Sequence, residues 1–219
     1  MAEHTTRTVR EHYAKLAEGY DDGANAACKR AYERLIPVDL RGCARVLEIG
    51  AGASPLLDAI GAPFSCGADL SHAMLSRRNA AAGAARVVAD MQQAPFPPSS
   101  FDGVYSLNVM EHVPDPAALL RECHRLLAPG GRCALITPNG GVAGLLELLE
   151  RLRLKLPEGP HRFVDTAELR RHAEAAGFRV ERIETLLAFP AGPDALVQFI
   201  DRCCAGKFGL FLHAVFVKP

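Results

Sequence analysis

Five stretches of this chain have the composition of buried β-strands, and helical patterns separate most of them. The strand-like stretches are apolar almost throughout and lie at residues 44–50, 64–70, 85–90, 101–108 and 131–139. A strand that is apolar on both faces has to be covered on both faces, which is typical of a parallel sheet with crossover helices. The alternation therefore predicts an α/β fold, a doubly wound and mostly parallel sheet. Two further strand-like runs follow at 178–189 and 209–219.

Helix-start signals fall between these strands, where crossover helices are expected. Serine and aspartate favour the N-cap because their side-chain oxygens accept backbone N–H groups of the first turn. Pro55 and Pro116 each stand one position after a candidate cap, where proline fits the first helical turn. The predicted N-caps are Ser54, Ser71, Asp115 and Asp165.

Length and composition indicate one globular domain. The chain has 219 residues, 49% of them hydrophobic and 23% charged, with a formal net charge of +0. A neutral chain offers no bulk attraction to nucleic acid, so no nucleic-acid partner is expected. No apolar run reaches membrane-spanning length, and the polar start contains no signal core, so we expect a cytoplasmic protein without integral membrane association. Within the single domain 1–219 we expect an N-terminal helical cap, a cofactor-binding core, an insert or lid, and a C-terminal part of the sheet, over 1–43, 44–139, 140–164 and 165–219.

The seven cysteines are best explained as small buried hydrophobic residues. Their number is odd and none forms a C-x-x-C pair, so no metal site is expected. The adjacent Cys203 and Cys204 keep one alternative open, a thiolate site for a soft metal or metalloid.

The loop after the first strand has the form of a ligand-binding turn. Ligands of parallel α/β sheets bind beyond the carboxyl ends of the strands. Here Glu48 is followed by Gly50 and Gly52, and glycine lets the backbone turn tightly and approach a ligand closely. A plain tight turn between strand and helix is the alternative.

Acids also follow the second and third strands. Asp69 stands 17 residues after Gly52, close to the spacing at which an acid reaches a ribose diol. Asp90 could accept from the exocyclic amine of adenine while Met91 packs on the ring. The alternatives are an acid that stabilises a helix N-terminus and a solvated loop acid.

The fourth strand is followed by "NVMEHVPDP", which contains two adjacent titratable groups. Asn108 is expected at the edge of the pocket, and Glu111 and His112 over it. Histidine is suited to moving protons near neutral pH, so His112 is a candidate base, although a structural histidine is equally compatible with the sequence.

Two details separate this pattern from a nicotinamide-binding fold. The dinucleotide fingerprint needs a third glycine or alanine, and Pro55 occupies that position. Glu48 would also face a pyrophosphate with the wrong sign of charge. A ligand with a positive amino group and a positive sulfur would instead be stabilised by an acid there.

Taken together, these stretches resemble the class I S-adenosylmethionine-dependent methyltransferases. The matching segments are "VLEIGAGAS", "GADLS", "VVADMQQAPFPPSSFDGVYSLNVMEHVPDP" and "LLAPGGRCALITPN", in family order over residues 44–139. The resemblance implies a Rossmann-like, seven-stranded sheet whose last strand is antiparallel. It implies S-adenosyl-L-methionine as cofactor and S-adenosyl-L-homocysteine as product. Ser54 departs from the pattern, because many members have glycine there.

The resemblance also implies a role for each strand-end residue. Glu48, Gly50 and Gly52 would line the methionyl end, and Asn108 would contact it through its backbone. Asp69 would bind the ribose hydroxyls and Asp90 the adenine amine. The ring faces would be covered by Leu70 and Met91. The upstream "YAKLAEGYD" resembles the family's N-terminal cap, which implies that Tyr20 reaches the methionyl end.

Two phrases narrow the resemblance to methyltransferases of the ubiquinone-biosynthesis type, "MEHVPDP" and "HRFVDTAEL". This subset methylates phenolic hydroxyls or ring carbons of hydrophobic substrates, which implies transfer to a small aromatic or apolar acceptor, at a hydroxyl oxygen. A hydroxyl must lose its proton to a base, and the candidates are His112 and Glu111, with His161 third. Methylation at nitrogen, carbon, sulfur or a metalloid stays open, as does a non-catalytic cofactor-binding module.

The insert at 141–156 carries an apolar stripe. Its members are spaced as on one helical face: Leu145, Leu148, Leu149 and Leu152. We expect a lid over the acceptor or a helix packed on the body or on a second subunit, so a homodimer is compatible with the sequence. A surface helix that touches membrane lipid through Arg151, Arg153 and Lys155 is the less favoured alternative.

Overall fold

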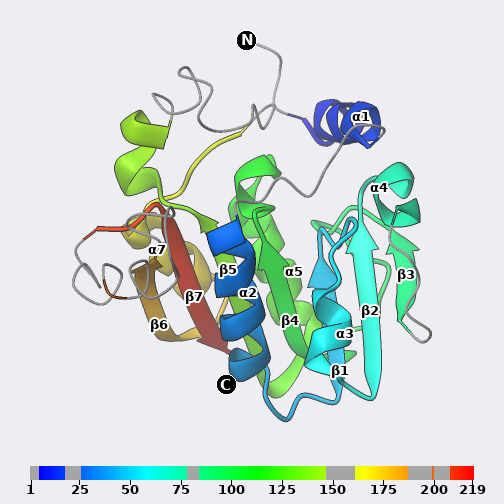
Figure 1. The fold of residues 1–219 in the computed structure, drawn as a ribbon. Coiled ribbons are helices and arrows are strands. Elements are labelled where there is room, and N and C mark those ends of the chain that lie inside the picture. Colours follow the sequence, from blue (N-terminus) through cyan, green and yellow to red (C-terminus); the bar gives the residue numbers. More distant parts are fainter. Residues whose placement is uncertain (1–4, 18–25, 78–83, 147–160, 187–198, 200–207) are drawn as a thin grey trace.

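The computed structural model describes residues 5–17, 26–77, 84–146, 161–186, 199 and 208–219. Its centre is one seven-stranded sheet with the order β3-β2-β1-β4-β5-β7-β6 (Figure 1). The strands are β1 Arg45–Ile49, β2 Phe64–Asp69, β3 Ala85–Val88, β4 Phe101–Leu107, β5 Leu127–Pro138, β6 Arg179–Leu186 and β7 Phe211–Val217.

Helices cover both faces of this sheet. One face carries α2 and α3, whose residues Ile36 and Leu57 pack with Val46 of β1. The other carries α5 and α7, whose Leu120 and Leu169 belong to one hydrophobic cluster with Leu47 of β1. Figure 1 shows α1 beyond the carboxyl ends of the strands. The helices are α1 Thr6–Leu16, α2 Ala26–Asp39, α3 Leu56–Ile60, α4 His72–Ser76, α5 Pro116–Leu126 and α7 Thr166–Ala175, with the 3₁₀ turns η1 Met110–His112 and η2 Gly140–Val142.

Strand directions confirm the predicted fold class. β1 pairs in parallel with β2 and β4, β2 with β3, and β4 with β5. β7 is antiparallel to both of its neighbours, β5 and β6. In the register of the parallel strands, Glu48 of β1 lies between Gly67 of β2 and Tyr105 of β4. The carboxyl ends of these strands therefore meet at one edge of the sheet.

Three of the four predicted N-caps are confirmed, and one is wrong. Ser71 accepts from the N–H of Met74, and Asp115 and Asp165 each accept from the N–H three residues on. The exception is α3, which begins at Leu56 with Pro55 as its N-cap. Pro55 takes a backbone conformation outside the helix, with φ −85° and ψ 0°. Ser54 is thereby displaced by one position, and its hydroxyl accepts from the N–H of Leu56 at 3.2 Å.

The fifth strand is longer than its sequence predicts. β5 begins at Leu127, which pairs with Phe101 of β4, and α5 ends directly before it at Leu126. Gly130 has φ +76°, a left-handed conformation that glycine adopts without steric cost. Because of this turn, the first residues of β5 do not form one continuous apolar run with the rest of the strand.

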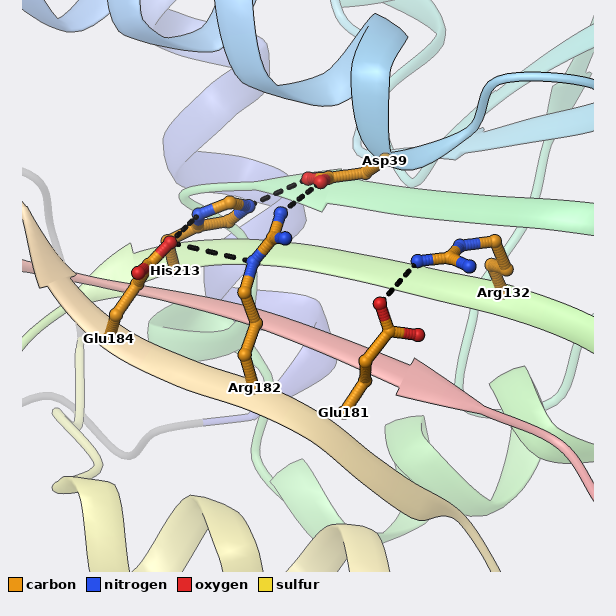
Figure 2. A network of polar contacts seen from close by, with 6 residues as sticks. All are labelled: Asp39, Arg132, Glu181, Arg182, Glu184 and His213. Atoms are coloured by element: carbon orange, nitrogen blue, oxygen red, sulfur yellow. Dashed lines mark hydrogen bonds and ion pairs between the residues drawn. The ribbon is translucent and has the colours of Figure 1, made fainter.

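A buried polar network ties α2 to the outer strands of the sheet (Figure 2). Asp39 ends α2, and its carboxylate lies 2.7 Å from Nε2 of His213 on β7. The other ring nitrogen of His213 lies 3.2 Å from Glu184 on β6. Arg182 of β6 also donates to Asp39. Asp39 and His213 are almost fully buried, so this network fixes where the end of α2 lies on the sheet.

Candidate active site

A cavity of about 240 Å³ lies at the carboxyl ends of the central strands. Its walls include three acids from the carboxyl ends of β1, β2 and β3: Glu48, Asp69 and Asp90. It is also lined by Tyr13 of α1 and Tyr32 of α2. The fold thus brings together the strand-end residues that the sequence singled out and adds two helices that cover them.

The loop after β1 is shaped by its glycines. Gly50 and Gly52 have φ values of +70° and +41°. A Cβ at Gly50 would meet Cγ2 of Val109 at 2.1 Å, so only glycine fits against the segment after β4. The N–H groups of Gly50 and Ala51 donate to the carbonyl of Ala68 at 2.8 and 3.0 Å. The loop is therefore held against the end of β2 and forms a close backbone cradle at the cavity.

Asp69 is held by backbone donors on both of its oxygens. Its Oδ2 accepts from the N–H of Gly52 at 2.9 Å, and its Oδ1 accepts from the N–H of Ser71 at 2.8 Å. Burial raises the pKa of the Asp69 carboxyl, and these backbone hydrogen bonds work against that rise. Each oxygen keeps a further lone pair, so this fixed carboxylate can accept hydrogen bonds from two hydroxyl groups of a ligand.

Asp90 connects the end of β3 to α1. Its Oδ1 accepts from the N–H of Gln92 at 2.9 Å, and its Oδ2 accepts from the hydroxyl of Thr6 at 3.3 Å. Met91 is buried beside it, and Leu70 lines the same cavity. The two apolar side chains therefore lie in the same cavity as two acids, as the sequence predicts for a bound nucleoside.

The candidate bases occupy different places. His112 lines the cavity and is 5% exposed. Glu111 is fully buried and does not line the cavity; its Oε2 accepts from Thr137 at 3.0 Å, and its Oε1 lies 3.9 Å from Nε2 of His112. His161 stacks on Phe163, with ring centroids 4.5 Å apart, and is not among the cavity residues. Of the three, only His112 lies where it could meet a substrate directly.

Asn108 lies at the edge of the cavity, directly after β4. It has φ +52°, and its N–H donates to the carbonyl of Ile136 at 2.8 Å. Its side-chain Nδ2 donates to the hydroxyl of Tyr32 at 2.8 Å. Tyr20 lies outside the described residues, so its predicted place at the methionyl end stays a prediction.

The helices α1 and α2 contribute further residues to the cavity: Thr6, Val9, Arg10, Tyr13, Lys29 and Tyr32. Tyr13 begins the stretch "YAKLAEGYD", which the family resemblance had already indicated, and the other five belong to no motif recognised in the sequence. Tyr13 also packs edge-on against His112, with ring centroids 5.4 Å apart. A signal was present in and just after α2, because Tyr32, Ile36 and Leu40 are spaced four apart and are all buried. That spacing would have placed α2 on the sheet, with Tyr32 at its cavity end.

The described cysteines do not form a reactive cluster. Burial raises the pKa of the Cys43 and Cys66 thiols to about 11, which keeps them protonated at neutral pH. Within the described ranges no three His, Cys, Asp or Glu side chains are grouped as metal ligands would be. Cys203 and Cys204 lie outside these ranges. None of the helices that the structure describes is long and apolar enough to cross a membrane.

A family model described as a methyltransferase domain matches residues 10–183. This covers more than half of the chain and includes every described cavity residue from Arg10 onward. With the sheet order and the strand-end acids, it defines the class: the chain belongs to the class I S-adenosylmethionine-dependent methyltransferases.

Among its curated relatives are enzymes of two pathways. A ubiquinone biosynthesis O-methyltransferase from Neisseria meningitidis is 36% identical over 159 residues, covering 65% of this chain and 66% of that one. A 27-O-demethylrifamycin SV methyltransferase from Amycolatopsis mediterranei is 33% identical over 188 residues, covering 77% and 68%. The match spans just under two thirds of the length of the ubiquinone-type relatives.

Solved structures share the fold at low sequence identity. An S-adenosylmethionine-dependent methyltransferase from Thermotoga maritima superposes with a TM-score of 0.73 at 20% identity, over 96% of this chain and 100% of that one. The N-methyltransferase NodS from Bradyrhizobium japonicum, in complex with S-adenosyl-L-homocysteine, gives 0.69 at 13% identity, over 97% and 99%. These similarities confirm the seven-stranded architecture.

Proposed function

We propose that this chain transfers the methyl group of S-adenosylmethionine to a hydroxyl oxygen of a small aromatic or apolar acceptor. The observation that carries the proposal is the joint placement of Glu48, Asp69 and Asp90 around one glycine cradle, with His112 in the same cavity. S-adenosylmethionine supplies the methyl group on a positively charged sulfur.

The residues of the cavity fit the parts of this cofactor. Asp69 would accept from the ribose hydroxyls, since backbone donors already fix both of its oxygens. Asp90 would accept from the adenine amine, with Leu70 and Met91 against the ring. Gly50 and Gly52 leave room for the methionyl end. Glu48, buried in the wall, supplies the negative charge that a cationic ligand needs.

His112 is the residue proposed to remove the proton of the acceptor. Methyl transfer is an in-line displacement, so the enzyme chiefly aligns the nucleophile and excludes water. A hydroxyl must lose its proton during the transfer, and a histidine beside it can take that proton. Glu111 lies behind the ring and would orient it, with its own carboxylate held by Thr137. Tyr13 covers the ring from α1.

The acceptor class is argued from relatives and from the cavity. The ubiquinone-type and rifamycin relatives are named for methylation of oxygen atoms. Val9, Tyr13 and Val113 add apolar surface to the cavity, and Tyr13 packs against His112. We also propose a cytoplasmic setting, a homodimer, and a lid role for the insert 140–164. Within that insert Leu146 is buried and Leu145 exposed, and residues 147–160 lie outside the described ranges.

The first prediction tests the cofactor site. Asp69→Asn should weaken binding of S-adenosyl-L-homocysteine at least tenfold, which is about 1.4 kcal/mol of binding free energy. The reason is that a neutral amide replaces a carboxylate that accepts hydrogen bonds from two hydroxyl groups. Isothermal titration calorimetry measures the dissociation constant, and Glu174→Gln, exposed on α7, is the control. Failure of the wild-type chain to bind S-adenosyl-L-homocysteine would remove the proposed function, and wild-type affinity in Asp69→Asn would remove the ribose assignment.

A further inference from the structure

The backbone at Asn108 holds an unusual conformation where the cavity meets the end of β4. Its φ of +52° is in the left-handed region, which asparagine tolerates better than most residues. The N–H of Asn108 is bonded to Ile136 of β5, so this conformation is fixed by the sheet. Residues held in sparsely populated conformations cluster at functional sites, which makes Asn108 a candidate for a functional residue.

Tyr32 fixes the direction of the Asn108 amide. Nδ2 of Asn108 donates to the Tyr32 hydroxyl at 2.8 Å. Burial raises the pKa of Tyr32 well above its ordinary value near 10, so the hydroxyl stays neutral and its oxygen keeps accepting. Because the two ends of a primary amide point apart, this bond turns Oδ1 of Asn108 away from Tyr32.

Oδ1 of Asn108 lacks a hydrogen-bond partner among the described residues, although the atom is buried. Asn108 and Tyr32 both line the cavity. A buried carbonyl oxygen without a donor is costly, so such groups usually find a partner in a water or a ligand. Because Asn108 lines the cavity, a ligand bound there can supply the donor that the described residues do not.

We propose that Oδ1 of Asn108, oriented by Tyr32, accepts a hydrogen bond from an N–H or O–H donor of the bound ligand. This inference rests on the proposed function and deepens it. It assigns to the Asn108 side chain a hydrogen bond with the ligand, in addition to the backbone contact of Asn108 expected from the family resemblance. Two ligand groups have the required chemistry, the amino group of the cofactor and a hydroxyl of the acceptor.

Two substitutions at one position test this without straining the backbone. Glycine and aspartate both tolerate a positive φ, so Asn108→Gly removes the acceptor and Asn108→Asp retains it. Calorimetry measures the affinities for S-adenosyl-L-homocysteine, for 5′-methylthioadenosine, which lacks the amino and carboxyl groups, and for catechol added to protein loaded with S-adenosyl-L-homocysteine. Thermal unfolding checks that each variant is folded.

The source of the donor decides which affinity falls. If it is the cofactor's amino group, Asn108→Gly weakens S-adenosyl-L-homocysteine about tenfold, leaves 5′-methylthioadenosine unchanged, and Asn108→Asp restores the affinity. If it is an acceptor hydroxyl, catechol binding falls by a similar factor while the affinity for S-adenosyl-L-homocysteine is retained. Unchanged binding of both ligands in Asn108→Gly overturns the inference.

Tyr32→Phe provides a readout that a merely structural role would not move. It removes the hydroxyl that orients the amide and should reproduce part of the loss seen in Asn108→Gly. In the Asn108→Gly background it should add nothing, since no amide is left to orient. Additive losses would contradict the coupling. Absence of S-adenosyl-L-homocysteine binding in the wild-type chain overturns the proposed function itself, a result distinct from normal wild-type binding with unaffected variants.

Discussion

His112 combines burial with access to the cavity. Its backbone N–H closes the 3₁₀ turn η1 onto the carbonyl of Val109 at 2.9 Å, which fixes where the ring begins. Tyr13 packs against one side of the ring and Glu111 lies within 3.9 Å of Nε2. A ring restricted in this way loses little freedom when a substrate binds, as a positioned base requires.

The prediction at this position concerns turnover. His112→Gln should lower kcat by a factor of about 10² or more, because general-base catalysis contributes that much, while the affinity for S-adenosyl-L-homocysteine changes less than about twofold. Transfer of labelled methyl groups to catechol measures turnover, and calorimetry measures affinity. His172→Gln on α7 is the matched control, because its ring lies 3.3 Å from Glu168 and is not among the residues that line the cavity. An unaltered kcat in His112→Gln would make this histidine structural.

At the scale of elements, α2 links the outer strands to the cavity. Its last residue, Asp39, is bonded to His213 and Arg182 (Figure 2). Two turns earlier, the hydroxyl of Tyr32 accepts from Asn108. The helix therefore contacts the outer strands at its last residue and the cavity wall two turns earlier. The nearby pair of Arg132 and Glu181 is much more exposed, with side chains 31% and 35% accessible.

Removing the buried acid should be far more costly than removing the exposed one. Asp39→Ala should lower the free energy of unfolding by about 3 kcal/mol or more, because His213 and Arg182 lose a buried partner. Glu181→Ala should cost less than about 1 kcal/mol, since exposed ion pairs contribute little. Urea unfolding followed by circular dichroism measures both. Equal losses would show that the network at Asp39 has no special structural weight.

The elements also show which features are local enough to predict. Ser71, Asp115 and Asp165 cap helices through atoms three residues away, so sequence spacing suffices. Ser54 was misassigned because Pro55 displaced it by one position, which the same rules do not resolve. The pairing of Asp39 with His213 joins residues 174 positions apart, and no local pattern indicates it.

For the whole molecule, acid stability depends on carboxylates that the fold keeps ionised. Glu122 of α5 is one: its hydrogen bond with Arg125 lowers the pKa of its carboxyl, and the N–H of Ala94 adds to this at 2.7 Å. A lowered pKa means that the unfolded chain binds more protons. This stabilisation is present above the unfolded value, near 4.5, and is lost as pH falls through the folded value.

Glu122→Gln should therefore destabilise the chain at neutral pH and matter less in acid. The expected loss at pH 7 is about 1–3 kcal/mol, because a charge-assisted pair is removed, and the difference from the wild type should shrink towards pH 3. Urea denaturation at a series of pH values measures it, with the exposed Glu174→Gln as control. A difference that stays constant with pH would contradict the assigned linkage.

The sequence also predicted most of one side of the site and little of the other. Glu48 and Asp69 lie at the ends of β1 and β2, and Asp90 and Asn108 come just after β3 and β4. A parallel sheet brings such positions to one edge whatever the details of packing. The opposite wall comes from α1 and α2, which precede the first strand. Their approach depends on long-range contacts such as that of Thr6 with Asp90. Those contacts depend on tertiary packing, which spacing alone does not encode.

The place of β7 has a consequence for biosynthesis. It lies between β5 and β6, yet residues 211–217 are translated after every other strand of the sheet. While the ribosome is still making this region, β6 has no partner to pair with, and β5 presents an open edge. Strands β1 to β4 have all their pairing partners before β7 is made, so this half of the sheet can form on the nascent chain. The other half forms only after β7 is made and pairs with both β5 and β6.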